Sequence, residues 1–233
     1  MAADAVGILA RQVGEAVPGA EIDVVETLDL DFGRPALRGG RVVVEEQCTL
    51  HQKTGWQAHG ILWRCVLRSL EAALSTGDDS RPLDRRNVMV LGTGPMARAL
   101  ARGIARRKGL VSISGPDDKA AQAAAGQLEA RFVPLASLYD TLADVVVVAD
   151  AQLKAGHHRH ELNPGWFRPS MTIADVTRLP EDTTFLREAR ERGCRVVEPA
   201  TIQAEILGEQ FRAVTGKPLP DGIVERVRQE AAE

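Results

Sequence analysis

The sequence predicts an α/β protein with a doubly wound parallel sheet, and three observations carry this prediction. Short apolar runs alternate with helix-like segments over residues 88–198. One of these runs begins at Val88 and leads directly into a turn that contains Gly92 and Gly94. A helix-like segment of small residues follows that turn. Because such alternation is typical of parallel sheets covered by helices on both faces, we expect a Rossmann-type domain.

A small α/β domain is expected before this sheet, over residues 1–56. Its elements would be a helix over 4–17 and strands over 21–28 and 41–47, with a turn rich in Gly, Pro and Arg at 33–40. The second domain, 57–233, would begin with a linking helix over 57–76. Apolar or small residues line one face of that helix: Ile61, Leu62, Cys65, Val66, Ser69, Leu70 and Ala73.

The rest of the second domain is expected to hold the parallel sheet and C-terminal helices. A polar break at 77–86 precedes the first strand. Beyond the glycine turn, strands are expected at 110–114, 131–134, 144–149, 171–175 and 194–198. Helices are expected at 117–128, 136–142, 182–192, 201–215 and 221–232.

The glycine turn has the spacing of a dinucleotide-binding crossover. Gly92 would permit the tight turn, Gly94 would let the backbone approach a pyrophosphate, and Ala97 would let the helix lie close to the sheet. Free N–H groups at the start of the helix would bind the phosphates. The cofactor-binding residues expected here are Gly92, Thr93, Gly94, Pro95, Met96 and Ala97.

Composition excludes several other classes of function. A formal net charge of −3 gives no positive field for a polyanion, so a nucleic-acid partner is not expected. No stretch has the roughly 18 apolar residues of a membrane span, and the N-terminus lacks a secretory pattern. The cysteines Cys48, Cys65 and Cys194 are widely spaced, which fits a reducing compartment. We therefore expect a cytoplasmic protein without a membrane or nucleic-acid partner.

The histidines do not indicate a metal site. Cys48, His51, His59 and Cys65 match none of the usual zinc-ligand spacings. The cluster that begins at His157 is expected to be a solvated loop. No metal is expected.

The C-terminal half carries residues at the spacing of a known family pattern: Asp175, Pro180, Thr183, Leu186, Ala189, Gly193, Phe211, Thr215 and Gly216. With these residues the chain resembles the shikimate dehydrogenase family. With the glycine turn and the linking helix, the similarity covers about residues 55–220. The resemblance implies a family fold with a reduced N-terminal domain. It also implies a family activity, the NADPH-linked reduction of 3-dehydroshikimate, in which a Lys–Asp pair transfers the proton.

The substrate side departs from the family pattern. His59 stands where the family has its catalytic Asp, and Lys53 is the lysine nearest to it in the sequence. The family's N-terminal serines have no counterpart. Arg178 replaces a Tyr, and Ile206 replaces a Gln that faces the substrate. His59 and Lys53 are the candidate catalytic residues, and a helix-start His59 is also explained as a structural hydrogen-bond partner.

The cofactor side departs from the family as well. Ser114, Gly115 and Pro116 align with the family's Asn-Arg-Thr, whose Arg binds the 2′-phosphate of NADP. Ser114 stays a candidate cofactor contact, but Gly115 supplies no cation. Asp117 and Asp118 follow and would repel a phosphate, while one of them could accept the ribose hydroxyls of NAD. The expected cofactor is NAD or NADP, with NAD favoured.

Three functions remain open from the sequence. The first is an NAD(P)-linked oxidoreductase that acts on a CH–OH group of an altered, unknown small-molecule substrate. The second is a pseudoenzyme that keeps the Rossmann fold as a nucleotide-binding or assembly module. The third comes from the stretch Gly92–Pro95, which is similar to the phosphate turn of methylene-tetrahydropterin dehydrogenases. A homo-oligomer is compatible with each of them.

Overall fold

The computed structural model describes the backbone of residues 22–24, 37–38, 41–44, 48–52, 56–75, 81–156 and 162–215. Side chains are described within the ranges 61–75, 81–156, 162–206 and 208–209. The chain divides into two compact units. One comprises Met1–Leu62 with Ala204–Glu233, and the other comprises Trp63–Gln203.

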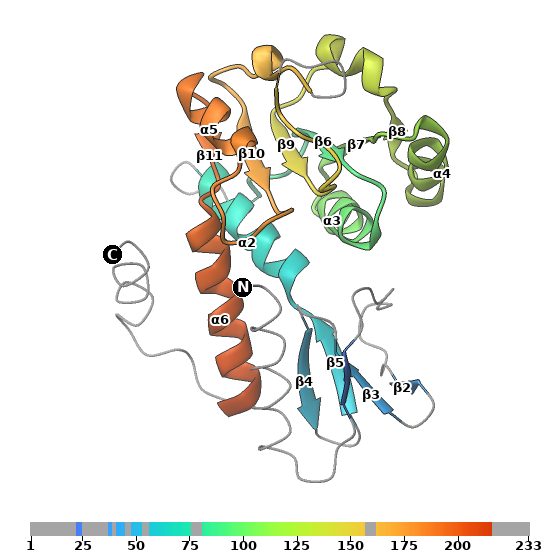
Figure 1. Ribbon diagram of the computed structural model, residues 1–233, viewed down its shortest axis with the longest axis vertical. Helices are drawn as coiled ribbons and strands as arrows, with labels where there is room; N and C mark the ends of the chain where they lie inside the picture. The colour runs from blue at the N-terminus through green and yellow to red at the C-terminus, as the bar shows by residue number, and fades with distance from the viewer. Residues whose placement is uncertain are drawn as a thin grey trace. The chain divides into compact units, whose positions relative to one another are not determined.

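The larger unit is built on a parallel sheet of six strands in the order β11-β10-β9-β6-β7-β8 (Figure 1). Its strands are β6 (Asn87–Leu91), β7 (Leu110–Ser114), β8 (Arg131–Phe132), β9 (Val145–Val148), β10 (Thr172–Asp175) and β11 (Arg195–Val196). This is the strand order of dinucleotide-binding folds. The chain moves outward from β6 in one direction, returns to β9, and moves outward in the other, so the order reverses between β6 and β9. The predicted Rossmann-type sheet is confirmed.

Helices follow the strands as the alternation predicts. They are α3 (Pro95–Arg106), α4 (Asp118–Leu128), α5 (Thr184–Glu191) and α6 (Pro199–Thr215), with 3-10 turns η1 (Leu135–Asp140) and η2 (Pro164–Trp166). The structure has the short η1 turn where the sequence predicts an α-helix over 136–142. The helices α3 and α4 pack against β6, β7 and β8, whereas α5 packs against β10 and β11. Right-handed crossovers that run in opposite directions place their helices on opposite faces of the sheet.

The core of the larger unit lies on both faces of this sheet. All four valines of β9 are buried, as expected of a central parallel strand. One cluster of buried apolar side chains includes Met89, Ile173, Phe185 and Leu186. It fixes the strand ends from which the loops of the candidate site leave.

The linking helix is shorter than predicted. The structure has strand β5 (Trp56–Gly60) and then helix α2 (Leu62–Leu74), where the sequence predicts a single helix over 57–76. The first residues are held instead by an antiparallel ladder with strand β4 (Cys48–Gln52), which sequence periodicity does not reveal. Within α2 the predicted apolar face is correct, because Cys65, Val66 and Leu70 are fully buried.

The N-terminal unit contains two small sheets in its described residues. β1 (Ile22–Val24) pairs in parallel with β3 (Arg41–Val44), and β2 (Leu37–Arg38) pairs with β3 in antiparallel orientation. The strands β4 and β5 form a separate hairpin. The helices expected over 4–17 and 221–232 lie outside the described residues.

Candidate functional site

The glycine turn lies where the strand order reverses. It joins the end of β6 to the start of α3, and Gly92 there has a φ of +139°, which side chains rarely permit. A Cβ on Gly92 would lie 3.1 Å from the carbonyl carbon of Ala149 and 3.1 Å from the Cβ of Asp150. Glycine is therefore required at this position by the fold itself, because the chain that leaves β9 passes directly against it.

At Gly94, in contrast, neither the backbone conformation nor the neighbouring atoms of the described residues require glycine. Its φ of −69° and ψ of 176° are open to any residue. A Cβ built on Gly94 would meet no atom of the described residues within 4 Å. The space that this Cβ would fill lies at the N-cap position of α3. A ligand that approaches the backbone there needs glycine, and such an approach is the role of the second glycine in dinucleotide-binding turns.

The start of α3 is arranged to receive an anion. No side chain caps this helix, and its first residue is Pro95, which has no N–H group. The N–H groups of Met96 and Ala97 in the first turn have no intrahelical acceptor. Together with the helix dipole they favour a negatively charged oxygen in front of the turn. The side chain of Ala97 is buried, so α3 lies close to the sheet.

Arg98 folds back over the glycine turn. Its Nε donates a hydrogen bond of 2.9 Å to the carbonyl oxygen of Thr93, and its Nη1 donates one of 2.6 Å to Oε1 of Gln127 in α4. The N–H of Gly92 donates to the carbonyl oxygen of Ser114 at 2.8 Å. These bonds fix the turn against both β7 and α4.

The side chain at the end of β7 is enclosed by protein. Ser114 is fully buried, and its hydroxyl has no hydrogen-bond partner among the described atoms. A cofactor contact from Ser114 therefore stays a prediction. Gly115 follows it, and a Cβ there would lie 3.2 Å from Cγ2 of Thr93.

The two carboxylates after Gly115 have structural partners. Asp117 is the N-cap of α4 and accepts hydrogen bonds from the N–H groups of Lys119 and Ala120. Asp118 accepts one from the N–H of Leu135 at 3.3 Å. Both remain exposed, so they still place negative charge at the end of β7. On the other side of the reversal, Asp150 accepts a hydrogen bond from the N–H of Gln152 at 2.9 Å, which gives that carboxylate a local partner.

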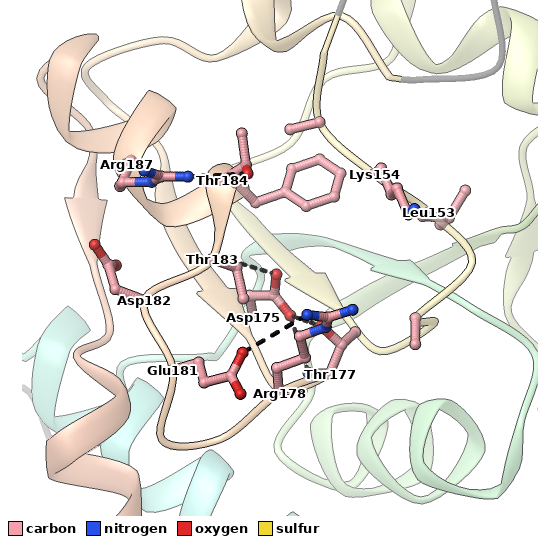
Figure 2. Close-up of a pocket in the computed structure, with 13 residues that line it drawn as sticks. Leu153, Lys154, Asp175, Thr177, Arg178, Glu181, Asp182, Thr183, Thr184 and Arg187 are labelled. Atoms are coloured by element: carbon pink, nitrogen blue, oxygen red, sulfur yellow. Dashed lines mark hydrogen bonds and ion pairs between the residues drawn. The ribbon is translucent and has the colours of Figure 1, made fainter.

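A pocket of about 380 Å³ opens beyond the carboxyl end of β10 (Figure 2). One wall is the loop after β9, with Leu153 and Lys154, and the other is the segment 175–187. The buried carboxylate of Asp175 lies at its base. Oδ1 accepts hydrogen bonds from the N–H and hydroxyl of Thr177, and Oδ2 accepts one from the hydroxyl of Thr183.

Sequence reasoning identifies some of this pocket and misses the rest. Asp175 and Thr183 match the family pattern, and Arg178 departs from it. Lys154 and Arg187 are not singled out by the sequence, because an isolated basic residue carries no signal of its role. Ile206, the other departure, is buried in α6.

The candidate catalytic residues lie in the N-terminal unit. His59 is in β5 rather than at the start of a helix, and the register pairs it with Thr49. Lys53 lies outside the described residues, and the side chain of His59 does as well. Their role therefore stays a prediction. The cluster from His157 to His160 also lies outside the described residues.

Metal-binding clusters and membrane-spanning helices are both absent from the described part of the chain. No group of three or more His, Cys, Asp or Glu side chains there is arranged to hold a metal ion. No helix there has both the length and the apolar character to cross a membrane.

The sheet order and the glycine turn define this protein as a member of the Rossmann-type α/β class. No protein-family model matches the chain. A curated shikimate dehydrogenase (NADP(+)) from Moorella thermoacetica is 33% identical over 178 residues, which cover 71% of this chain and 58% of that protein. The chain is thus similar to shikimate dehydrogenases, as a divergent relative of them.

Solved structures of similar proteins share this fold. Shikimate 5-dehydrogenase from Thermus thermophilus, in complex with shikimate, is 25% identical with a TM-score of 0.60, over 79% of this chain and 67% of that one. Quinate dehydrogenase from Corynebacterium glutamicum, in complex with NAD, is 23% identical with a TM-score of 0.59, over 78% and 65%. The chain thus spans 58% of the Moorella relative's length and about two thirds of these structures.

Proposed function

We propose that this chain is an NAD(P)-linked oxidoreductase that acts on a CH–OH group of a small-molecule substrate other than shikimate. The observation that carries the proposal is Gly94, whose backbone conformation and surroundings among the described residues do not require glycine. The unfilled space at its α-carbon, in front of an uncapped helix start, fits the pyrophosphate of a dinucleotide.

The residues around the turn have complementary roles toward such a cofactor. Met96 and Ala97 would donate their N–H groups to the phosphate oxygens, and Arg98 would keep the turn in place through Thr93. A bound nicotinamide would supply or accept the hydride, so the protein has to orient the substrate and move one proton. The quinate dehydrogenase neighbour was solved with NAD, and a Thermus thermophilus shikimate 5-dehydrogenase structure was solved with NADP(H) and shikimate. Both cofactors therefore belong in the test.

A change of substrate follows from the departures at the polar positions. The family's catalytic Asp is His59 here, its Tyr is Arg178, and its substrate-facing Gln is Ile206, which is buried. Arg178, in contrast, lines the pocket beyond β10. A site with a guanidinium in place of a phenol and an alkyl group in place of an amide favours a substrate with a different pattern of polar groups.

The register of the β4–β5 hairpin favours a second candidate, a nucleotide-binding protein without dehydrogenase activity. The residue paired with His59 in this ladder is Thr49, so the register gives His59 neither a lysine nor a carboxylate as its direct cross-strand partner.

Calorimetric titration of the full chain with NAD and NADP tests the nucleotide site. We expect saturable binding of at least one cofactor, and loss of that binding in Gly94→Val, because a branched side chain would fill the space in front of α3. Circular dichroism would verify that the variant is folded. Absence of binding to the wild-type chain, or normal binding to the variant, would overturn the proposal.

If a cofactor binds, spectrophotometric assays with a panel of hydroxy acids and polyols separate the two candidates. Sustained nicotinamide reduction with any of them supports an enzyme. Cofactor binding with no turnover across the panel favours the binding module.

A further inference from the structure

The pocket beyond β10 carries basic side chains from both of its walls. Lys154 comes from the loop after β9, whereas Arg178 and Arg187 come from the segment that includes the start of α5 (Figure 2). Hydroxyl groups of Thr177 and Thr184 lie in the same lining. The pocket therefore combines positive charge with neutral hydrogen-bonding groups.

The acidic side chains Asp175 and Asp182 in the lining are already engaged. Asp175 accepts the hydrogen bonds of Thr177 and Thr183 at both of its oxygens. Asp182 forms an ion pair of 2.7 Å with Arg190, which lies outside the lining. Neither carboxylate forms an ion pair with Lys154, Arg178 or Arg187 in the described part of the chain.

The basic side chains are held only weakly. Arg178 and Glu181 approach to 3.7 Å while both side chains are about two-thirds exposed, so solvent screens their attraction. Arg187 donates a hydrogen bond to the hydroxyl of Thr184 at 3.2 Å, and this acceptor is uncharged. The ammonium group of Lys154 has no hydrogen-bond or ion-pair partner among the described residues. An incoming anion would therefore meet uncommitted cations.

We propose that this pocket binds an oxyanion group, a carboxylate or a phosphate, of the small-molecule substrate. Lys154 and Arg187 would hold the anion from opposite walls, and Arg178 would join them by exchanging Glu181 for the ligand. In open α/β sheets ligands bind beyond the carboxyl ends of the strands, and the pocket has this position at β10. The identification of the ligand as the substrate rests on the proposed function, whereas anion binding is a property of the pocket itself.

The proposal can be tested by NMR titration of the full chain with inorganic phosphate and, separately, with succinate at constant ionic strength. We expect saturable shifts of the amide resonances of 177–187 with at least one of them. Tighter binding of phosphate would identify a phosphorylated ligand, and tighter binding of succinate would identify a carboxylate. Shifts that do not saturate, or that are absent from 177–187, would overturn the proposal.

The Kd of the anion in variants that each lack one positive charge provides a second test. Lys154→Gln and Arg187→Gln each remove a charge from an exposed side chain, and each should raise the Kd of the anion by about fivefold or more. Arg102→Gln removes an exposed charge from α3, outside the pocket, and should leave the Kd unchanged. Equal Kd values for all three variants would show that the anion is attracted by net charge alone, which would overturn the pocket assignment.

The two proposals fail independently. Phosphate could also bind at the glycine turn, so the titration is repeated in Gly94→Val, where the shifts of 177–187 should persist. NAD affinity should be unchanged in Arg187→Gln. If the wild-type chain binds NAD or NADP but neither anion at 177–187, the pocket assignment alone is overturned. If it binds an anion there but neither NAD nor NADP, the nucleotide site alone is overturned.

Discussion

The hydroxyl of Thr183 donates a hydrogen bond of 2.6 Å to the buried carboxylate of Asp175. This bond joins the last residue of β10 to the residue before α5. The other carboxylate oxygen accepts bonds from the N–H and the hydroxyl of Thr177. Burial of a carboxylate is unfavourable unless such donors compensate it, so these residues form one structural unit.

Replacement of Asp175 should therefore destabilise the protein substantially. Asp175→Ala leaves several donors without an acceptor and should lower the free energy of unfolding by about 3 kcal/mol. Thr183→Val removes a single donor and should lower it by about 1 kcal/mol. Urea denaturation followed by circular dichroism measures both. Equal effects of the two variants would contradict a network centred on Asp175.

The two glycines of the turn should respond differently to substitution by alanine. Gly92→Ala places a Cβ at a positive φ against the backbone of Ala149, and should destabilise the fold by about 2 kcal/mol. Gly94→Ala meets no described atom, and the entropy that it removes from the unfolded chain opposes the poorer N-cap preference of alanine, so stability should change by less than about 0.5 kcal/mol. Thermal unfolding of the two variants in parallel measures both effects. An equal loss of Tm would contradict the prediction that only Gly92 is required by the fold.

NADP should bind no more tightly than NAD. Gly115 offers no cation, Asp117 and Asp118 place negative charge at the end of β7, and two nitrogens of Arg98 already bond to Thr93 and Gln127. Calorimetry with both cofactors is the measurement, and clearly tighter NADP binding would contradict this prediction.

A designed variant tests whether a positive charge at position 115 shifts the cofactor preference towards NADP. A side chain at position 115 is crowded by Cγ2 of Thr93, so Thr93→Ala makes room for Gly115→Arg. The double variant should improve NADP binding relative to NAD by about tenfold, through a charge-assisted bond to the 2′-phosphate. Thr93→Ala alone serves as its control and should leave the preference unchanged.

Shikimate should not be oxidised at a useful rate. Loss of a buried hydrogen-bond partner typically costs about 1–3 kcal/mol, and several polar positions of the family have changed here. The assay follows nicotinamide reduction with NAD and with NADP over about pH 6 to 10, a range that covers the titration of histidine. Turnover at roughly 1–1000 per second would show that other residues perform the chemistry. Lys53→Ala would then test the first candidate.

Cys194 should be unreactive at neutral pH. Burial raises the pKa of its thiol, against a smaller opposing effect from the charge of Arg192, and the Sγ lies 3.1 Å from the carbonyl oxygen of Arg168. Because the pKa is higher in the folded state, the protonated thiol favours folding below about pH 8.5, and this contribution is lost as the pH rises further. Iodoacetamide labelling with peptide mapping should show slow modification in the native chain and fast modification in urea. A Cys194→Ala variant should lack the alkaline loss of stability.

The sequence predicts the Rossmann-type sheet well because its signals are local. The valines at 145–148 and the apolar run before Gly92 indicate buried parallel strands, and the glycine spacing marks the crossover between β6 and β7. The bounds of β7, Leu110–Ser114, agree with the expected strand at 110–114.

The parts that sequence reasoning misses depend on pairing between distant residues. β5 contains Gln57, Ala58 and His59, which fit a helix as readily as a strand, and its ladder with β4 decides the outcome. The pocket is another case, since Lys154 and Arg187 line one pocket only when the loops after β9 and β10 are placed. The burial of Ser114 is not foreseeable either, because a serine at a strand end carries no signal of what will cover it.

The bonds that Arg98 and Gly92 make have a consequence for the thermodynamics of ligand binding. They hold the glycine turn in its shape through contacts within the protein itself. The entropy of ordering this loop is thus lost during folding rather than during association, which is the meaning of preorganisation. An Arg98→Ala variant would lose that advantage, so its nucleotide affinity would fall through a less favourable entropy of binding, while the phosphate contacts themselves stay the same.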